Sequence, residues 1–209
     1  MRTRSSALAE LASEIRAADL TDWASVSDRF TTWAGRPGLR DELRHHLRTL
    51  SGEVAAAVIS RSRETTTHFA WCLLNDPGDK FSFWLHEYKP QKDWRIGYAD
   101  SIHNHRYHFC TTILRGSYVH ERFDTEMDLA GLTIKSATMV RSGPCEAGES
   151  ATMLSDEFHR IPKAADGTMT FLVKSRPVRG WSLSFDPVTN ISRRHVPVEE
   201  RLGHLAERI

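Results

Sequence analysis

The chain has 209 residues, 40% of them hydrophobic, which is enough for one domain with its own core and no disulfide. Its 28 basic and 27 acidic residues nearly cancel, so the composition does not predict a nucleic-acid or membrane partner, and a small-molecule partner is expected. The three cysteines fit neither a disulfide framework nor a paired-cysteine zinc site. No apolar run has the length of a signal peptide or a bilayer span, so a cytoplasmic location is expected. The oligomeric state stays open.

Apolar residues recur at helical spacing through about the first fifty positions. The runs are Leu8, Leu11 and Ile15, then Trp23, Val26, Phe30 and Trp33, then Leu43, Leu47 and Leu50. Thr21 is the expected N-cap of the second helix, and Pro37 the expected first residue of the third. Stripes of this period face a core more often than a ligand, so we expect the tryptophans to be core residues.

After Ser51 the sequence changes to short runs rich in β-branched and aromatic residues, separated by turn formers. The runs are FAWCLL, KFSFWLHEY, HFCTTILRGSYVHERF, LTIKSATMV, ATMLSD, TMTFLVKS and WSLSFDP. They predict antiparallel strands in a small barrel or jelly roll. We expect a single domain over residues 1–209, with helices over 1–52, a β-barrel over 56–190 and a C-terminal helix over 197–209.

Histidines are concentrated between Ser101 and Gly116. In an extended chain alternate side chains share a face, so His103 and His105 can direct two imidazole nitrogens at one ion. His159, from a distant strand, would complete one face of a coordination sphere and leave positions open for substrate and oxygen. His108 lies an odd number of residues from His105, so it is a fourth ligand only if a bulge intervenes, and otherwise a hydrogen-bonded residue beside the site.

The histidines belong to a set of motifs that each occur once in the chain: HNH at 103–105, Cys110 five residues later, a leucine-arginine-glycine turn, and His-Arg-Ile from His159. With DPGDKFSFWLHEY upstream and KSRP at the end, the segment from Phe69 to Pro177 resembles the cysteine dioxygenase branch of the cupins. The resemblance implies a mainly β, cupin-type small barrel preceded by a helical segment (α+β). It also implies that His103, His105 and His159 bind Fe(II). Cys110 stands where most other cupins have a glutamate.

The chain departs from the family pattern at four positions. Lys174 replaces the tyrosine that the family crosslinks to its cysteine, and Thr170 and Leu172 replace an accompanying serine and histidine. Trp71 lies near the place of the arginine that anchors the substrate carboxylate. These changes argue against an amino-acid thiol as the substrate. Lys174 is either a cation beside the metal that holds an enolate or phenolate oxygen, or an exposed residue at a strand end.

Three neutral imidazoles leave the charge of Fe(II) uncompensated, so we expect an anionic, chelating substrate. The sequence predicts an Fe(II)- and O2-dependent oxygenase of an aromatic, heterocyclic or enolisable small molecule in specialised metabolism. The residues expected to assist near the metal are Tyr107, Cys110, Arg160 and Lys174. The residues expected to line the pocket are Trp71, Phe83, Phe171 and Trp181.

Three alternatives keep the same histidines. One is a thiol dioxygenase, the second is a zinc-dependent hydrolase or isomerase, and the third is a cupin that binds a ligand without chemistry. Cys110 also has a plainer interpretation as a small buried hydrophobe, which is the usual role of a free cysteine.

Overall fold

The computed structural model describes residues 6–128, 130, 132–197 and 205. Four helices come first in the chain. They are α1 (Ala7–Arg16), α2 (Trp23–Ala34), α3 (Leu39–Arg48) and α4 (Gly52–Arg61). The strands follow, with two short 3-10 helices, η1 (Gln91–Asp93) and η2 (Tyr98–Asp100), among them. The predicted C-terminal helix falls largely outside the described residues.

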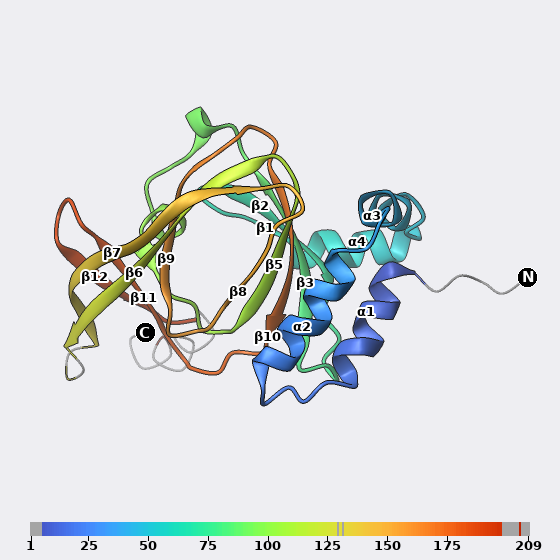
Figure 1. The fold of residues 1–209 in the computed structure, drawn as a ribbon, viewed down its shortest axis with the longest axis horizontal. Coiled ribbons are helices and arrows are strands. Elements are labelled where there is room, and N and C mark those ends of the chain that lie inside the picture. The colour runs from blue at the N-terminus through green and yellow to red at the C-terminus, as the bar shows by residue number, and fades with distance from the viewer. Residues whose placement is uncertain (1–5, 129, 131, 198–204, 206–209) are drawn as a thin grey trace, which may run out of the picture.

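Two antiparallel sheets of six strands each form the rest of the described chain. The helix-covered sheet runs in the order β1 (Arg63–Glu64), β2 (His68–Leu74), β3 (Phe81–Tyr88), β10 (Met169–Ser175), β5 (Phe109–Arg115) and β8 (Ser150–Met153). The outer sheet runs in the order β12 (Ile191–His195), β11 (Ser182–Asp186), β4 (Ile102–His103), β9 (Phe158–Ala164), β6 (Ser117–Asp128) and β7 (Thr133–Glu146). Figure 1 shows both sheets curving around a common interior. The predicted architecture, a mainly β barrel behind an N-terminal helical segment, is confirmed.

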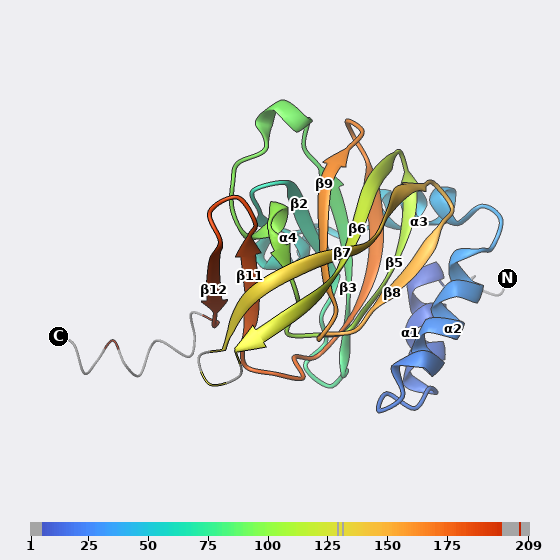
Figure 2. The ribbon, with the colours of Figure 1, turned by 60° about the vertical axis from the view of Figure 1, so that its left-hand side comes forward.

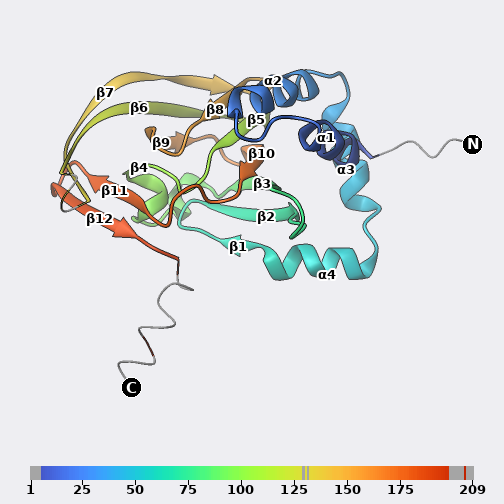
Figure 3. The ribbon, with the colours of Figure 1, turned by 90° about the horizontal axis from the view of Figure 1, so that it is seen from below.

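The helices lie on the side of the helix-covered sheet that faces away from the other sheet (Figures 1 and 3). The apolar stripes of α1 and α2 are buried as predicted, with Leu11, Ile15 and Phe30 at 0% exposure, whereas Leu47 of the third predicted stripe is exposed. The Phe30 ring stacks on Phe171 of β10, with centroids 6.3 Å apart and planes 7° apart. Burying a side chain of this size contributes about 1.5–3 kcal/mol, so the helices add substantially to the stability of this sheet.

The second helix begins one residue later than expected. The backbone N–H and hydroxyl of Thr21 both donate to the Asp19 carboxylate, at 2.9 and 2.7 Å, so Thr21 belongs to the preceding turn. Asp22 is the N-cap instead and accepts from the backbone N–H of Ala24 at 3.1 Å. Aspartate and threonine are both good N-cap residues, so propensity does not separate them. Asp22 is the N-cap because Thr21 is already hydrogen-bonded to Asp19.

The third and fourth helices also differ from the prediction. Gly38 adopts a left-handed φ of 78°, which a helix cannot include, so α3 starts at Leu39 and Pro37 lies outside it. Ser51 caps α4, which runs to Arg61 through residues assigned by sequence to the start of the barrel. The alanines of this segment favour a helix, and its lack of strand alternation fits that outcome.

The sequence run over residues 108–123 forms two strands and not one, because Gly116 turns the chain between β5 and β6. The strands β4, β9 and β12 were not among the predicted runs. β4 has only two residues, and β9 and β12 carry several charged side chains, so neither length nor hydrophobicity marks them. Figure 2 shows the long β6–β7 hairpin crossing the molecule from the end near the helices to the opposite end.

Replacing Gly116 with alanine is expected to destabilise the barrel. Gly116 has φ 76°, and an added Cβ would lie 2.4 Å from Oγ1 and 2.9 Å from Cα of the buried Thr168. Left-handed strain and overpacking together predict a loss of about 3 kcal/mol in the free energy of unfolding, measured by urea denaturation. Gly167→Ala is the control, since φ there is 70° but an added Cβ would have no atom within 4 Å beyond its two chain neighbours. Equal losses at the two sites would contradict the role given to the Thr168 contact.

Candidate metal centre

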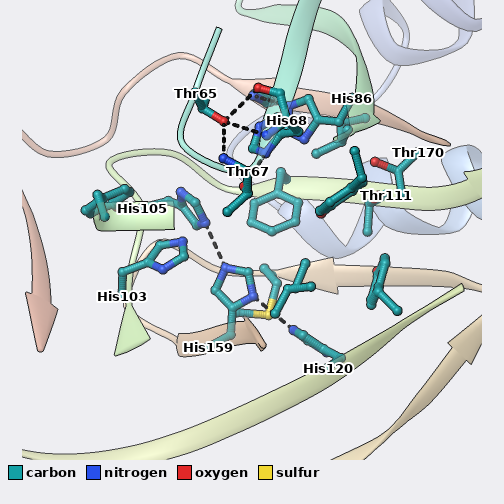
Figure 4. Close-up of a pocket in the computed structure, with 18 of the residues that line it drawn as sticks. Thr65, Thr67, His68, His86, His103, His105, Thr111, His120, His159 and Thr170 are labelled. Carbon is teal, nitrogen blue, oxygen red and sulfur yellow. Dashed lines mark hydrogen bonds between the residues drawn. The ribbon is translucent and has the colours of Figure 1, made fainter. Parts of the chain in front are cut away.

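Pairing between β4 and β9 brings together two of the three predicted ligands. His103 and His159 are direct partners across the two strands, and each side chain is only 5% exposed. Residues paired across antiparallel strands point to the same face, so both imidazoles enter the interior of the barrel. Figure 4 shows the two rings side by side with His105.

Asn104 fixes the turn between the two histidines of the HNH motif. It is 1% exposed, its backbone N–H donates to the Leu183 carbonyl at 3.2 Å, and its Oδ1 accepts from the Leu183 N–H at 2.7 Å. Its own carbonyl accepts from the Tyr98 hydroxyl. The strand ends at His103, so the regular extended chain used in the prediction stops early. The anchored Asn104 nevertheless leaves His105 on the same side as His103.

The nitrogens of the three histidines are placed to share one ion. One ring nitrogen from each of His103, His105 and His159 lies within 4.8 Å of the others, and Nε2 of His105 and Nε2 of His159 are 2.9 Å apart. Two nitrogens bound at about 2.1 Å and at a right angle to each other would be about 3 Å apart. Nδ1 of His103 donates to the Ser101 carbonyl at 2.8 Å, so its Nε2 keeps a free lone pair. The residues therefore fit a metal ion with three facial nitrogen ligands.

A fourth histidine, His120 on β6, orients one of the ligands. Its Nε2 lies 2.9 Å from Nδ1 of His159. If His159 offers Nε2 to an ion, its Nδ1 carries the proton and donates to His120, which fixes both tautomers. The sequence analysis did not single out His120. The sequence signal for His120 was its spacing of two from Tyr118 in the run SYVHERF, which places both side chains on one face of a strand.

Burial keeps these imidazoles uncharged. It lowers the pKa of His103 to about 4 and that of His120 to about 4, and it holds the pKa values of His105 and His159 well below the ordinary histidine value. Proximity of the imidazoles to one another lowers the pKa of His159 further. Only a neutral imidazole can coordinate a metal, so the site is ready for a cation at neutral pH.

The three histidines lie on the wall of a cavity of about 370 Å³ between the sheets. The aromatic residues that line it are Tyr88, Tyr98, Tyr107, Phe109 and Tyr118. Among the described residues no aspartate or glutamate lines it, whereas Arg63 and Lys174 do. The cavity therefore has an aromatic wall, two basic side chains and several imidazoles, with no acidic side chain to oppose them among the described residues. This lining suits an anionic ligand.

The structure places two of the predicted assisting residues, Tyr107 and Lys174, on the cavity wall. The Tyr107 ring stacks on His105 with centroids 5.2 Å apart. Lys174 is 4% exposed, and its Nζ lies 3.2 Å from Nε2 of His86, so it is not an exposed strand end. The sequence analysis missed His86 and its neighbour His68, which also line the cavity.

Four other predicted residues lie on the helix side of the same sheet. Phe83 and Phe171 have no exposed surface and pack in the core beneath the helices, and Trp71 packs against that core with its Nε1 donating to Glu87 at 3.1 Å. Cys110 lies there too, and burial raises its pKa to about 11. The prediction that these residues line the pocket or act near the metal is corrected, because strand alternation directs their side chains toward the helices.

Three further predicted residues are also away from the cavity. The Nδ1 of His108 accepts from the backbone N–H of Ser155 at 3.0 Å, and His108 is absent from the histidine group, so the fourth-ligand alternative is not realised. Arg160 follows His159 on β9 and pairs with Glu121 at 2.6 Å. Trp181 packs against a small core of the outer sheet. Arg160 points away from the cavity because it directly follows His159 in β9, and neighbouring residues face opposite sides of a strand.

No protein-family model and no curated protein sequence matches the chain. Solved structures with partial likeness include an oxalate decarboxylase of Bacillus subtilis, with 16% identity over 57% of this chain and 28% of that chain and a TM-score of 0.37. An ectoine synthase of P. lautus shares 14% identity over 59% of this chain and 75% of that chain, with a TM-score of 0.37. An 11S globulin of Wrightia tinctoria shares 9% identity over 70% of this chain and 34% of that chain, also with a TM-score of 0.37.

The chain spans about a third or less of the length of the oxalate decarboxylases it resembles. The resemblance to the cysteine dioxygenase branch stays a prediction. Across the described residues, no helix is long and apolar enough to cross a membrane. The function must therefore be argued from the residues of the site.

Single replacement of any of the three histidines by alanine is expected to abolish metal binding. Loss of His103, His105 or His159 leaves two ligands, which cannot complete the facial set, so stoichiometric metal measured by inductively coupled plasma mass spectrometry should disappear. His108→Ala is the matched control and should retain metal, because its ring bonds to Ser155. Retention of metal by His159→Ala, or its loss in His108→Ala, would show that the ligands are misassigned.

Replacement of His120 by alanine is expected to weaken metal binding without abolishing it. The hydrogen bond from His159 orients the ligand ring, and loss of such partners reduces metal affinity by about 10- to 100-fold. Competition with a chelator of known affinity measures the change. His45→Ala, which removes an exposed histidine of α3 in the helical layer, should leave the affinity unchanged. An unchanged affinity in His120→Ala would contradict the orienting role.

Proposed function

We propose that the chain is a non-haem Fe(II)-dependent oxygenase that uses O2 to oxidise a small, chelating, aromatic, heterocyclic or enolisable substrate. The observation that carries the proposal is the group of three neutral histidines, His103, His105 and His159, on the wall of an aromatic cavity. Bound Fe(II) would supply open coordination positions where substrate and O2 meet. The three-histidine group itself is a feature of the structure, whereas the metal and the reaction are the proposal.

The charge of the cavity supports a substrate that binds the metal directly as an anion. Three imidazoles bring no negative charge, and within the described part of the chain no carboxylate lines the cavity. A divalent cation held there would keep its full charge, so an anionic ligand gains more than a neutral one. Enzymes that use 2-oxoglutarate usually hold iron with two histidines and one carboxylate, and this site lacks that carboxylate.

The protein residues around the histidines bind and orient the substrate and limit the access of water. The rings of Tyr107 and Phe109 flank His105, with centroids 5.2 and 5.0 Å away, and form an aromatic wall beside the histidine group. Leu172 and Met153 make the neighbouring surface apolar. An aromatic substrate body would gain from contact with this wall, and the apolar surface would exclude water around it.

The chain lacks the features that a cysteine dioxygenase would need at the corresponding positions. Trp71, which stands near the place of the carboxylate-binding arginine, lies on the helix side of the sheet, and Cys110 is buried beneath the helices. The position of the crosslinked tyrosine holds Lys174. Cysteine would therefore find neither the expected anchor nor the crosslink at this site.

Anaerobic loading with Fe(II) followed by nitric oxide spectroscopy tests the proposal. A 1,3-diketone or a catechol should perturb the iron–nitrosyl signal by direct chelation, and O2 uptake should then require both iron and substrate. Cysteine, cysteamine and 3-mercaptopropionate are the comparison set. Rapid formation of a sulfinate from any of these would make the protein a thiol dioxygenase. Stoichiometric zinc with turnover indifferent to O2 would make it a hydrolase or isomerase.

A further inference from the structure

Two cations, Lys174 and Arg63, lie against the same ring beside the part of the cavity formed by the helix-covered sheet, and neither has a carboxylate partner among the described residues. Nζ of Lys174 lies 4.5 Å from the centroid of the Trp84 ring, and Cζ of Arg63 lies 5.1 Å from the same ring. Both residues line the cavity. Cation–π contact offsets part of the cost of holding them there, but an indole ring does not neutralise either charge.

Other cations of the structure contrast with this pair. Lys89 is as deeply buried as Lys174, and its Nζ lies 2.5 Å from Glu64. Arg160 pairs with Glu121, and Arg122 pairs with Glu157. Among the described residues no ion pair involves Lys174 or Arg63. Burial, and then the charge of Arg63, hold the pKa of the Lys174 amine well below the ordinary lysine value. An anionic ligand would supply the missing negative charge and favour the protonated amine, so this position is suited to binding an anion.

Two histidines complete this part of the wall. Nζ of Lys174 lies 3.2 Å from Nε2 of His86, and the His86 ring stacks on His68 with centroids 4.2 Å apart. The Thr67 hydroxyl lies 2.9 Å from Nδ1 of His68, which holds that ring in place. An ammonium group has three donors, so the contact with His86 leaves two available to a ligand. Figure 4 shows His68 and His86 on a different wall from His103 and His159.

The two walls are close enough to hold one small molecule. Tyr107 stacks on the ligand His105 at 5.2 Å between centroids, and Nζ of Lys174 lies 5.2 Å from the same Tyr107 ring. Both groups line one cavity of about 370 Å³. A compact molecule that spans the Tyr107 ring could therefore contact both.

We propose that Arg63, His68, His86 and Lys174 form a carboxylate-binding subsite for the substrate of the histidine centre. The inference rests on the proposed function and narrows its substrate class. The substrate carries a carboxylate at one end, which Lys174 and Arg63 bind, and a separate chelating group at the other, which reaches the metal. An aromatic or enolisable body between the two ends lies against Tyr107.

Binding of benzoate and of its neutral analogue benzamide to the metal-free protein tests the subsite by isothermal titration calorimetry. Benzoate should bind at least about tenfold more tightly than benzamide, because only benzoate supplies the missing charge. Lys174→Met should reduce the benzoate affinity by at least about tenfold and leave benzamide binding unchanged. Arg63→Met, at an exposed position, should weaken benzoate binding in the same sense.

Lys163→Met on β9 is the matched control, since it makes the same substitution at an exposed strand position and should change neither affinity. Lys174→Met should also raise the melting temperature of the metal-free protein, because an apolar side chain of similar length replaces an unpaired buried amine. Equal binding of benzoate and benzamide, no benzoate binding in the millimolar range, or full benzoate affinity in both variants would overturn the subsite. Because no metal is present, these results leave the iron proposal to its own test.

Discussion

The structure depends on one constraint: the central strands of the helix-covered sheet are buried on both faces, so each must satisfy two environments. In β10, Phe171 and Val173 face the helices, whereas Thr170, Leu172 and Lys174 face the cavity. The apolar set holds the sheet to the helices, and the opposite set determines what the interior can bind. A shift of register by one residue would exchange the two sets and destroy both the core and the site. The stability of the helical layer and the chemistry of the cavity are therefore linked through the same strands.

Much of the metal centre could be predicted because its signals are local or repeat a known pattern. The spacing of His103 and His105 directs both rings to one side, and the resemblance to a cupin branch added His159. The helices were also predictable, because apolar residues three and four apart mark a buried face. Spacing could not predict the structural role of Asn104. The strand ends at His103, and hydrogen bonds between Asn104 and Leu183, which is distant in sequence, hold the turn.

The pocket was harder to predict, because alternation tells which residues share a face but not which face is which. Phe83 and Phe171 are large and aromatic, so they were assigned to the cavity, yet they pack beneath helices that arrive from the other end of the chain. Residues on the opposite face of the same strands, such as His86, were not assigned to the cavity, although they line it. Without the position of the helices, a strand that is apolar on one face and mixed on the other does not reveal its interior side. Lys174 itself was the clearest clue in the sequence, since a lysine is seldom placed in an otherwise apolar strand unless its charge has a role.

The pairing of His103 with His159 also constrains when metal can be acquired. The two residues are far apart in the chain and meet only when β4 and β9 are joined in the outer sheet. In the unfolded chain the HNH motif alone offers two imidazoles at most, which is a weak and unselective site. An ion bound to all three histidines would act as a cross-link between distant strands and favour the folded state in proportion to its concentration and affinity. Metal supply would thus influence the lifetime of the protein as well as its activity.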